Sequence, residues 1–277
     1  MKIKNILFIL AISTLIFSCK NDDNEASFDA AKQALEDDVA LIDYLQKHYL
    51  NEADGGIWTI KNGETPLMEQ VEVQNITKDD ISYKLYYLIK EQGVGRNASK
   101  FDSVYVDYTG ILLDSTVFDP GRLTWFDLTS VLNSGASGFA FGLENFKEGV
   151  KIINSDESFY FENTGKGILF MPSGLGYGSN AQSVIPENSP LIFEISLNSI
   201  NESDHDNDGI LSKDEDVDND GDINDDDTDE DDIANYLDVD DDGDGKLTRD
   251  EDTNKNGNWF DDDADGDGIP NFLDKDS

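Results

Sequence analysis

Cysteine, histidine and basic side chains are scarce in this sequence. Its 277 residues include one cysteine and two histidines, His48 and His205, which lie far apart in the chain. One cysteine cannot form an internal disulfide, and no Cys or His cluster suggests a zinc site. Lysine and arginine number 20 against 60 aspartates and glutamates, a formal net charge of −40. So few cations cannot neutralise many phosphates, which argues against a nucleic-acid partner.

Motifs of several enzyme classes are also missing. There is no Gly-rich phosphate loop, and no serine has a partner base suited to hydrolysis. The 38% hydrophobic and 10% aromatic fractions still allow at least one core, and the length allows one or two domains. The charge is uneven, since residues 201–277 hold 32 acidic and 5 basic residues. Most of the negative charge therefore belongs to a C-terminal tail.

The N-terminus carries an apolar run that is shorter than the ~20 residues of a transmembrane helix. Two lysines precede the run 6–17, and Cys19 follows Ser18. This order is typical of a secretory signal peptide, here residues 1–18. The junction resembles a bacterial lipobox, which implies diacylation of Cys19 and an exported protein anchored in the outer membrane, facing the periplasm or the cell surface. The alternative is a free buried cysteine beside an ordinary cleavage site.

Residues 19–27 are polar and predict a short tether. Positions 20–23 (KNDD) resemble the tetrad that follows the cysteine in surface lipoproteins of the Bacteroidetes group. From Ser27, a plausible N-cap, apolar residues such as Leu35, Val39 and Ile42 recur at helical spacing. Short alternating segments at 57–61, 71–76 and 83–89 predict strands. Residues 28–95 are thus a helix-plus-strands extension, which either packs on the next domain or mediates self-association.

Residues 96–200 are predicted to form an α+β domain. Strands are expected at 104–108, 112–117, 159–161, 168–171 and 191–197, with one helix near 143–153. Many strands and one helix suggest a twisted antiparallel sheet wrapped on a helix.

Five short motifs follow one another through this domain. They are VDYTG at 106–110, VFD at 117–119, LENFKEGV at 143–150, PSGLGYG at 172–178, and Ile185-Pro186 followed by LIFEI at 191–195. In this order they resemble the FKBP family of peptidyl-prolyl isomerases. The resemblance implies an FKBP-like fold, isomerase activity on proline-containing polypeptides, and no cofactor for catalysis.

The resemblance also implies an aromatic cup. Its members would be Tyr108, Phe118, Trp125 or Phe126, Phe146, Tyr177 and Phe193, completed by Leu143 and Ile185. Phe146 would form the floor under the proline ring, where the family more often has tryptophan, and Gly142 replaces a residue that is often branched and apolar. The backbone N–H of Ile185 would bind a substrate carbonyl, while the Tyr177 hydroxyl and Asp119 would hold flanking groups. The alternatives are that the aromatics are ordinary core and that Asp119 is a structural hydrogen-bond acceptor.

The tail repeats a calcium-loop pattern. Oxygen-bearing residues at positions 1, 3, 5, 9 and 12, glycine at 6 and a backbone carbonyl at 7 match an EF-hand loop. Two segments match in full: Asp204, Asp206, Asp208, Ile210, Ser212 and Glu215, and then Asp240, Asp242, Asp244, Lys246, Thr248 and Glu251.

Three further loops begin at Asp216, Asp252 and Asp263 and end on aspartate, and a partial one begins at Asp238. Their expected ligands are Asp216, Asp218, Asp220 and Asp227; Asp252, Asn254, Asn256 and Asp263; and Asp263, Asp265, Asp267 and Asp274. Helices of EF-hand length are missing, and the overlapping loops resemble thrombospondin type-3 repeats. We therefore expect residues 201–277 to form a structural string of Ca²⁺ sites; the alternative is a disordered acidic spacer.

Together these features predict an exported, lipid-anchored prolyl isomerase that assists the folding of exported or surface proteins. Two other functions remain open from the sequence. The cup could bind proline-containing segments as a chaperone without turnover, or the calcium string could act as an adhesive or spacer that carries a passive domain.

Overall fold

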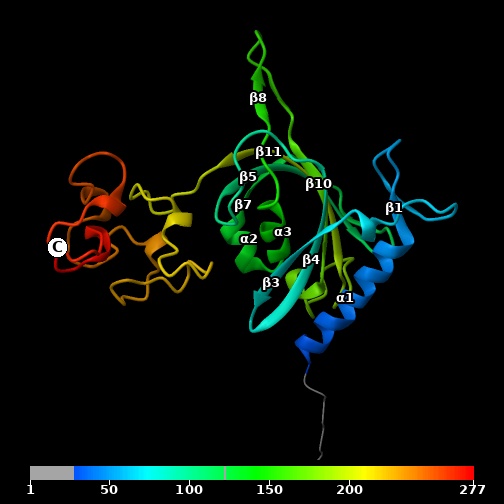
Figure 1. Cartoon of the computed structure of the whole chain (residues 1–277), viewed down its shortest axis with the longest axis horizontal. Helices are drawn as coiled ribbons and strands as arrows, with labels where there is room; N and C mark the ends of the chain where they lie inside the picture. The colour runs from blue at the N-terminus through cyan, green and yellow to red at the C-terminus, as the bar shows by residue number, and fades with distance from the viewer. Residues whose placement is uncertain (1–27, 122) are drawn as a thin grey trace, which may run out of the picture.

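The computed structural model describes residues 28–121 and 123–277. The predicted signal peptide, the lipidation site at Cys19, the tether and the predicted N-cap at Ser27 lie outside these residues. Figure 1 shows a curved sheet crossed by one long helix, with the acidic tail beyond the end of the last strand. The mixed architecture with a dominant antiparallel sheet confirms the predicted α+β class.

The main sheet has seven strands, all paired antiparallel. Its order is β3 (Glu72–Lys78), β4 (Ile81–Glu91), β10 (Gly165–Met171), β11 (Leu191–Asn201), β5 (Ser103–Leu112) and β6 (Val117–Asp119), and β7 (Thr124–Asp127) also pairs with β5. Two small hairpins stand apart from it, β1 (His48–Leu50) with β2 (Ile57–Thr59), and β8 (Val150–Ile153) with β9 (Phe159–Glu162). β3 and β4 come from the N-terminal extension, so this region packs into the same sheet as the central domain.

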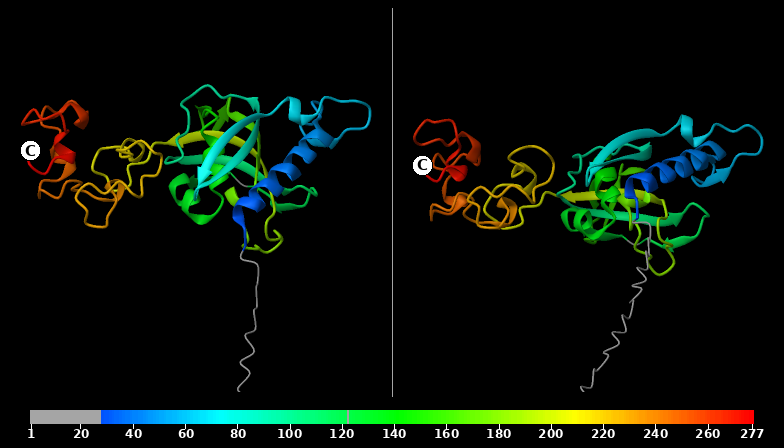
Figure 2. Two further views of the ribbon diagram at one scale, coloured as in Figure 1. Left: turned by 60° about the horizontal axis from the view of Figure 1, so that its bottom comes forward. Right: turned by 90° about the horizontal axis from the view of Figure 1, so that it is seen from below.

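The first helix, α1 (Ala30–Lys47), starts at an aspartate cap. The Asp29 side chain accepts a hydrogen bond from the Lys32 N–H at 2.9 Å, as an N-cap residue does. The buried face is shifted from the predicted one, because Leu35 and Val39 are 69% and 68% exposed while Leu41 and Leu45 are fully buried. α1 lies along the outer face of the sheet in Figures 1 and 2.

The helix predicted near 143–153 is wrong. Two helices, α2 (Leu128–Ser134) and α3 (Ser137–Leu143), precede that segment instead. The chain leaves the helical path after Leu143, and Val150–Ile153 forms β8, where the β-branched residues favour an extended backbone. Gly135, with φ of 120°, ends α2 and lets the chain turn directly into α3.

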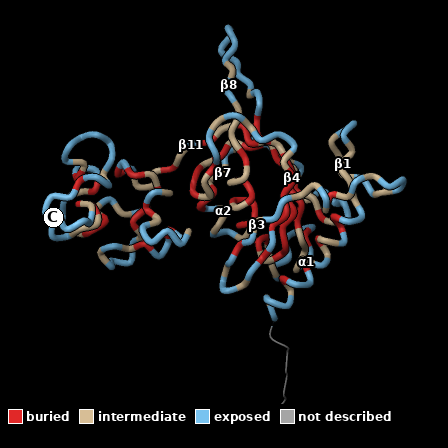
Figure 3. Tube along the Cα trace, in the orientation of Figure 1, coloured by how far each residue is buried: buried red, intermediate tan, exposed pale blue. Residues whose placement is uncertain are grey.

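The sheet separates two hydrophobic cores. Figure 3 shows many buried residues along the strands of the sheet. On the inner face, α2 and α3 bury Leu128, Phe139, Leu143 and Phe146 against strands that include Leu169 and Phe193. On the outer face, α1 and the 3₁₀ turn Leu67–Glu69 pack on Tyr86, Ile168, Phe170 and Ile192. A sheet apolar on both faces explains the nearly continuous hydrophobic run of β10.

The tail contains loops and short 3₁₀ turns but no α-helix between its described residues 202 and 277, as expected from the missing EF-hand helices. Loops beginning at Asp204, Asp216 and Asp227 recur 36 positions later at Asp240, Asp252 and Asp263. The hydrogen bonds recur too: the Asn235 N–H donates to the Asp226 carbonyl at 2.8 Å, and Asn271 donates to Asp262 at 2.8 Å. We call residues 204–239 the first repeat and residues 240–275 the second repeat.

The first repeat contacts the sheet domain directly. Ile223 and Tyr236 form a small buried cluster with Phe101. The His205 Nε2 atom lies 3.5 Å from a carboxylate oxygen of Asp127, and its ring meets Tyr236 edge-on. Lys213 pairs with Glu202 at the end of β11 at 2.6 Å. Figure 2 shows the tail beyond this end of the domain.

Candidate functional sites

An aromatic cavity opens between the inner face of the sheet and the α2–α3 turn. Its volume is about 160 Å³, and its walls are Tyr108, Phe118, Asp119, Phe126, Val131, Ser134, Ala136, Phe139, Tyr177 and Phe193. β5, β6, β7 and β11 supply one side, the helices another, and the loop after β10 brings Tyr177. Six of the lining residues are aromatic, so the cavity is a small apolar pocket with few polar groups.

Phe139 lines this pocket, contacts three of its other aromatic walls, and is not among the residues that the sequence motifs predict. It is 4% exposed and makes edge-to-face contacts with Phe193 at 5.2 Å, Phe126 at 5.7 Å and Tyr108 at 5.9 Å between ring centroids. These are favourable arrangements for aromatic pairs. Gly138 allows this packing, because a Cβ there would lie 3.0 Å from both Leu175 Cβ and Met171 Sδ.

The polar atoms of the pocket form one short hydrogen bond. The Tyr108 hydroxyl donates to Asp119 Oδ2 at 2.6 Å. Burial, reinforced by this bond, raises the pKa of Tyr108, and burial and the Asp119 charge raise the pKa of Tyr177. Both phenols are therefore neutral donors at physiological pH.

The structure brings together only some of the predicted cup residues. Tyr108, Phe118, Asp119, Phe126, Tyr177 and Phe193 line the cavity. Trp125 does not: it is half exposed and stacks on Tyr105 at 5.2 Å, since neighbouring residues of a strand point to opposite faces.

The structure places the residues predicted for the floor outside the lining of this cavity. Phe146 and Leu143 are fully buried in the inner core and do not line the cavity. Phe146 packs against Gly167 of β10, where a Cβ would lie 2.5 Å from its ring. The Ile185 N–H, expected to be free for a substrate, donates to the Gln182 carbonyl at 2.5 Å within its own turn.

The second candidate site is a series of carboxylate clusters in the tail. Five groups bring ligand atoms within 4.8 Å of one another: Asp206, Asp208, Glu215 and Asp241; Asp216, Asp218 and Asp226; Asp227, Asp229 and Asp231; Asp240, Asp242 and Asp244; and Asp263, Asp265 and Asp267. Four of the predicted loops are thus represented. The group of Asp227, Asp229 and Asp231 belongs to a loop that the sequence pattern did not predict.

A shared hydrogen bond shapes the loops. In five of them the first aspartate accepts the N–H of the residue five positions on, at 3.3 Å for Asp204, 2.9 Å for Asp227, 3.2 Å for Asp240, 2.8 Å for Asp252 and 3.0 Å for Asp263. In four of these the donor is a glycine with positive φ, which explains the glycine at position six.

Several predicted ligands have other partners. The hydroxyls of Ser212 and Thr248 accept the N–H of His205 and Asp241, at 3.2 and 3.1 Å, and so close their loops. Asp226, not Asp227, faces Asp216 and Asp218. The side-chain amides of Asn254 and Asn256 donate to Asp261. Backbone positions Ile210 and Lys246 accept no hydrogen bond from a described residue at their carbonyls.

Carboxylates in the first cluster are deeply buried. Glu215 is 0% and Asp241 is 1% exposed, and all four of their oxygens lack hydrogen-bond partners among the described residues. Burial and then the charges of Asp208 and Asp206 raise the pKa of Glu215 to about 10 and that of Asp241 to about 9. Such a cluster requires protons or a cation to offset its charge.

Comparisons with known proteins match the central domain and the tail to two different families. Residues 95–198 match the family model of FKBP-type peptidyl-prolyl cis-trans isomerases, and residues 205–261 match the model "BamM C-terminal". None of the helices in residues 28–121 and 123–277 combines the length and apolar character needed to cross a membrane.

Curated relatives align with the central region. A probable FKBP-type isomerase FkpA of Neisseria meningitidis is 30% identical over 128 residues, 45% of this chain and 42% of that protein. FkpA of Escherichia coli K12 is 32% identical over 113 residues, 41% of this chain and 36% of that protein. The isomerase Mip of Chlamydia trachomatis is 30% identical over 114 residues, 41% and 40% of the two chains. The match thus spans less than half the length of these relatives.

The chain is also similar to solved structures of isomerases. The crystal structure of E. coli FkpA aligns with a TM-score of 0.35 and 24% identity over 62% of each chain. An isomerase from Pseudomonas syringae aligns with a TM-score of 0.34 and 27% identity, covering 46% of this chain and 80% of that one.

Proposed function

We propose that this chain, whose residues 95–198 belong to the FKBP-type peptidyl-prolyl isomerases, catalyses cis-trans isomerisation of X-Pro bonds in polypeptides. The observation that carries the proposal is the 160 Å³ cavity with six aromatic walls and one carboxylate. Its size suits a single proline ring rather than a large ligand. The relatives named FkpA and Mip are described as isomerases, which supports the same activity here.

The pocket suits this reaction because of what amide rotation requires. A planar amide is stabilised by charge separation, and rotating it costs about 18–20 kcal/mol. In the twisted transition state the carbonyl is less polar, so an apolar, water-poor pocket disfavours the planar form relative to the twisted one. Phe139, which packs against three other aromatic walls of the cavity, is the residue on which we expect the proline ring to rest.

The polar groups at the rim then orient the peptide. Tyr177 has no hydrogen-bond acceptor for its hydroxyl among the described residues, so it can donate to a substrate carbonyl. Asp119 already accepts from Tyr108 at 2.6 Å and retains acceptor capacity for a flanking N–H. The Ile185 N–H would first have to leave the Gln182 carbonyl, so we assign it no role in the resting pocket.

A protease-coupled assay with a short X-Pro peptide tests this activity on the full chain. We expect acceleration over the uncatalysed rate, loss of at least about tenfold in kcat/KM for Phe139→Ala, and no change for Trp58→Ala, a half-exposed aromatic on β2. A wild-type rate equal to the uncatalysed rate, combined with measurable peptide binding, would instead indicate a non-catalytic chaperone.

We further propose that the tail binds Ca²⁺ as a structural ion. Oxygen-only ligands are what Ca²⁺ prefers, and unpartnered buried carboxylate oxygens at Asp206, Asp208, Glu215 and Glu251 support a cation there. When bound, the ions would offset part of the tail's negative charge. Calorimetric titration of the full chain with Ca²⁺ tests this; no heat of binding and no change in scattering would contradict it.

The site of action is a separate proposal. The lipobox-like junction at Cys19 supports export and lipid anchoring, and hence clients among exported or surface proteins. Expression with labelled fatty acid in a bacterial host tests it. The label should enter the wild-type chain and be absent from Cys19→Ser; equal labelling of both would contradict the proposal.

A further inference from the structure

The first carboxylate cluster contains a residue from the other repeat. Asp206, Asp208 and Glu215 belong to the loop that starts at Asp204, whereas Asp241 is the second residue of the loop that starts at Asp240. Position two is not a ligand position within its own 12-residue loop. Asp241 therefore turns away from its own loop and toward the preceding repeat.

The four side chains converge, and several of their buried oxygens lack a partner in the part of the chain that the structure describes. Each contributes an oxygen, and these atoms all lie within 4.8 Å of one another. Asp206 Oδ2, Asp208 Oδ2 and both oxygens of Glu215 and Asp241 have no hydrogen-bond partner in residues 28–121 and 123–277. Among the ion pairs of the described residues, none joins a lysine or arginine to any of the four. Leaving such groups buried and unpaired is costly, so the arrangement points to a cation between them.

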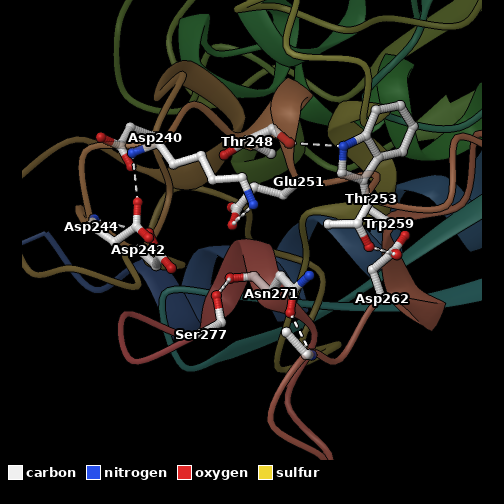
Figure 4. A network of polar contacts seen from close by, with 12 residues as sticks. Asp240, Asp242, Asp244, Thr248, Glu251, Thr253, Trp259, Asp262, Asn271 and Ser277 are labelled. Atoms are coloured by element: carbon white, nitrogen blue, oxygen red, sulfur yellow. Dashed lines mark hydrogen bonds and ion pairs between the residues drawn. The ribbon is translucent and has the colours of Figure 1, made fainter.

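The equivalent loop of the second repeat is built differently. Asp242, Asp244 and Glu251 correspond to Asp206, Asp208 and Glu215, but the position that corresponds to Asp241 is Ser277. Asp244 is exposed, and the Lys246 ammonium lies 3.5 Å from Glu251 Oε1. The Ser277 hydroxyl donates to the Asn271 carbonyl at 3.5 Å (Figure 4). This loop therefore lacks a carboxylate equivalent to Asp241 and has the Lys246 ammonium beside Glu251 instead.

A second contact joins the same two loops. A Cβ on Gly209, in the loop of the first cluster, would lie 2.6 Å from the indole ring of Trp259 in the second repeat. The Trp259 Nε1–H donates to the Thr248 carbonyl at 2.8 Å, which holds the ring in place (Figure 4). The fluorescence of Trp259 can therefore report ion binding at the first cluster.

We propose that Asp241 is a ligand of a Ca²⁺ site formed by both repeats, with Asp206, Asp208 and Glu215 as the ligands from the first repeat. The inference rests on calcium binding by the tail and adds which residues share one ion. Because the ion is held by loops 36 positions apart, its binding fixes the second repeat to the first. The charge of Asp241 also makes this site stronger than the equivalent loop at Asp240, where Lys246 offsets part of the charge of Glu251, since ligand charge count tunes affinity.

Terbium luminescence on the full chain tests the assignment. Tb³⁺ occupies calcium sites and is sensitised by a nearby tryptophan, so excitation of Trp259 should report the shared site, and Trp259→Phe should remove that signal. We expect Asp241→Asn to weaken the Trp259-sensitised binding by on the order of tenfold or more. Asp250→Asn, an exposed carboxylate in the neighbouring turn, should bind like the wild type.

Calorimetric titration with Ca²⁺ distinguishes failure of the shared-site proposal from failure of the calcium proposal. Loss of one strong site in Asp241→Asn and equally in Glu215→Gln, with the remaining sites intact, supports the shared site. Unchanged strong binding in Asp241→Asn would overturn it while leaving calcium binding by the tail intact. No Tb³⁺ or Ca²⁺ binding by the wild type would contradict the calcium proposal itself. Because asparagine has nearly the shape of aspartate, we expect Asp241→Asn to fold. Circular dichroism of the full chain checks that each variant keeps the folded sheet domain.

Discussion

Tyr108 and Asp119 are joined by a hydrogen bond of 2.6 Å that links the long strand β5 to the short strand β6 at the rim of the aromatic cavity. β6 has only three residues and pairs with β5 at two positions, so this side-chain bond is a substantial part of what holds it. Phe118, another wall of the cavity, lies on the same short strand. Loss of this bond should therefore loosen β6 and move Phe118, which would change the shape of the pocket.

Tyr108→Phe removes the donor and leaves the Asp119 carboxylate without it. We expect a loss of about 1–2 kcal/mol in the free energy of unfolding, as for a hydrogen bond to a charged group, and a lower kcat/KM. Urea unfolding and the peptide assay measure the two effects. Tyr105→Phe, on the other face of β5, is the matched control, and an equal loss of activity in both variants would contradict the assignment.

Phe139 and Phe146 are distinguished by substitution. Phe146 is fully buried in the core, so Phe146→Ala should cost about 3–5 kcal/mol in unfolding free energy. Phe139→Leu keeps most of the volume and should leave the chain folded while it lowers kcat/KM. If Phe146→Leu reduced the activity of folded protein more than Phe139→Leu, the floor of the pocket would have been assigned to the wrong residue.

Much of the sheet follows from the sequence because its strands carry β-branched and aromatic residues between clear breaks, as in β5 and β11. Four aromatic walls also follow, from motifs whose spacing matches a known family. The floor does not: Phe139, Leu143 and Phe146 stand at helical spacing, and the sequence alone does not say where the helix ends. The signal available was the pair Gly138-Phe139, a glycine that permits close packing next to an aromatic residue.

The ligands of the metal clusters could also be predicted only in part from the sequence. A 12-residue register considers one loop at a time, so it finds Asp206, Asp208 and Glu215 but assigns no role to Asp241. Only the folded path of the repeats brings Asp241 to Glu215. The register also assigns position twelve of the loop at Asp216 to Asp227, whereas Asp226, one residue earlier, faces Asp216.

Isomerase activity should be insensitive to pH between about 7 and 9. Tyr108 and Tyr177 have pKa values raised above the ordinary value of about 10. Their neutral hydroxyls, and any stability that depends on them, are therefore fully present below that value and are lost only as pH rises toward the raised pKa. A pH–rate profile of kcat/KM measures this. A decline centred near pH 8 would contradict it.

Asp37 supports the pocket from the outer face of the sheet. It is 2% exposed and accepts hydrogen bonds from the Ser173 N–H at 2.7 Å and hydroxyl at 2.5 Å. Ser173 begins the turn that leads to Tyr177. Asp37→Ala leaves a buried N–H unpaired, so we expect a loss of about 1–3 kcal/mol in unfolding free energy and reduced activity.

Asp43→Asn, on the same helix in an exposed pair with Lys47, is the control and should have no effect on either measurement. Wild-type activity in a fully folded Asp37→Ala protein would show that the helix does not support the pocket.

Because the first repeat contacts the sheet domain, we expect calcium binding by the tail to stabilise the sheet domain against unfolding. Ile223 packs with Phe101 and Tyr236 at this contact. A ligand that binds only the docked, folded form stabilises it. We expect Ca²⁺ to raise the melting temperature of the sheet domain in the wild type and to raise it less in Ile223→Ala. Ile233→Ala, an exposed residue of the same repeat, is the control. Equal shifts in all three proteins would contradict the coupling.

The central claim is that the aromatic cavity accelerates rotation about X-Pro bonds. Exchange spectroscopy by NMR on a peptide with one X-Pro bond, at catalytic amounts of the full chain, observes that rotation directly and needs no coupled protease. The account predicts cis–trans exchange peaks with the wild type, and their loss with folded Phe139→Ala. Exchange that stays at the uncatalysed rate with the wild type, or that persists unchanged in Phe139→Ala, would contradict it.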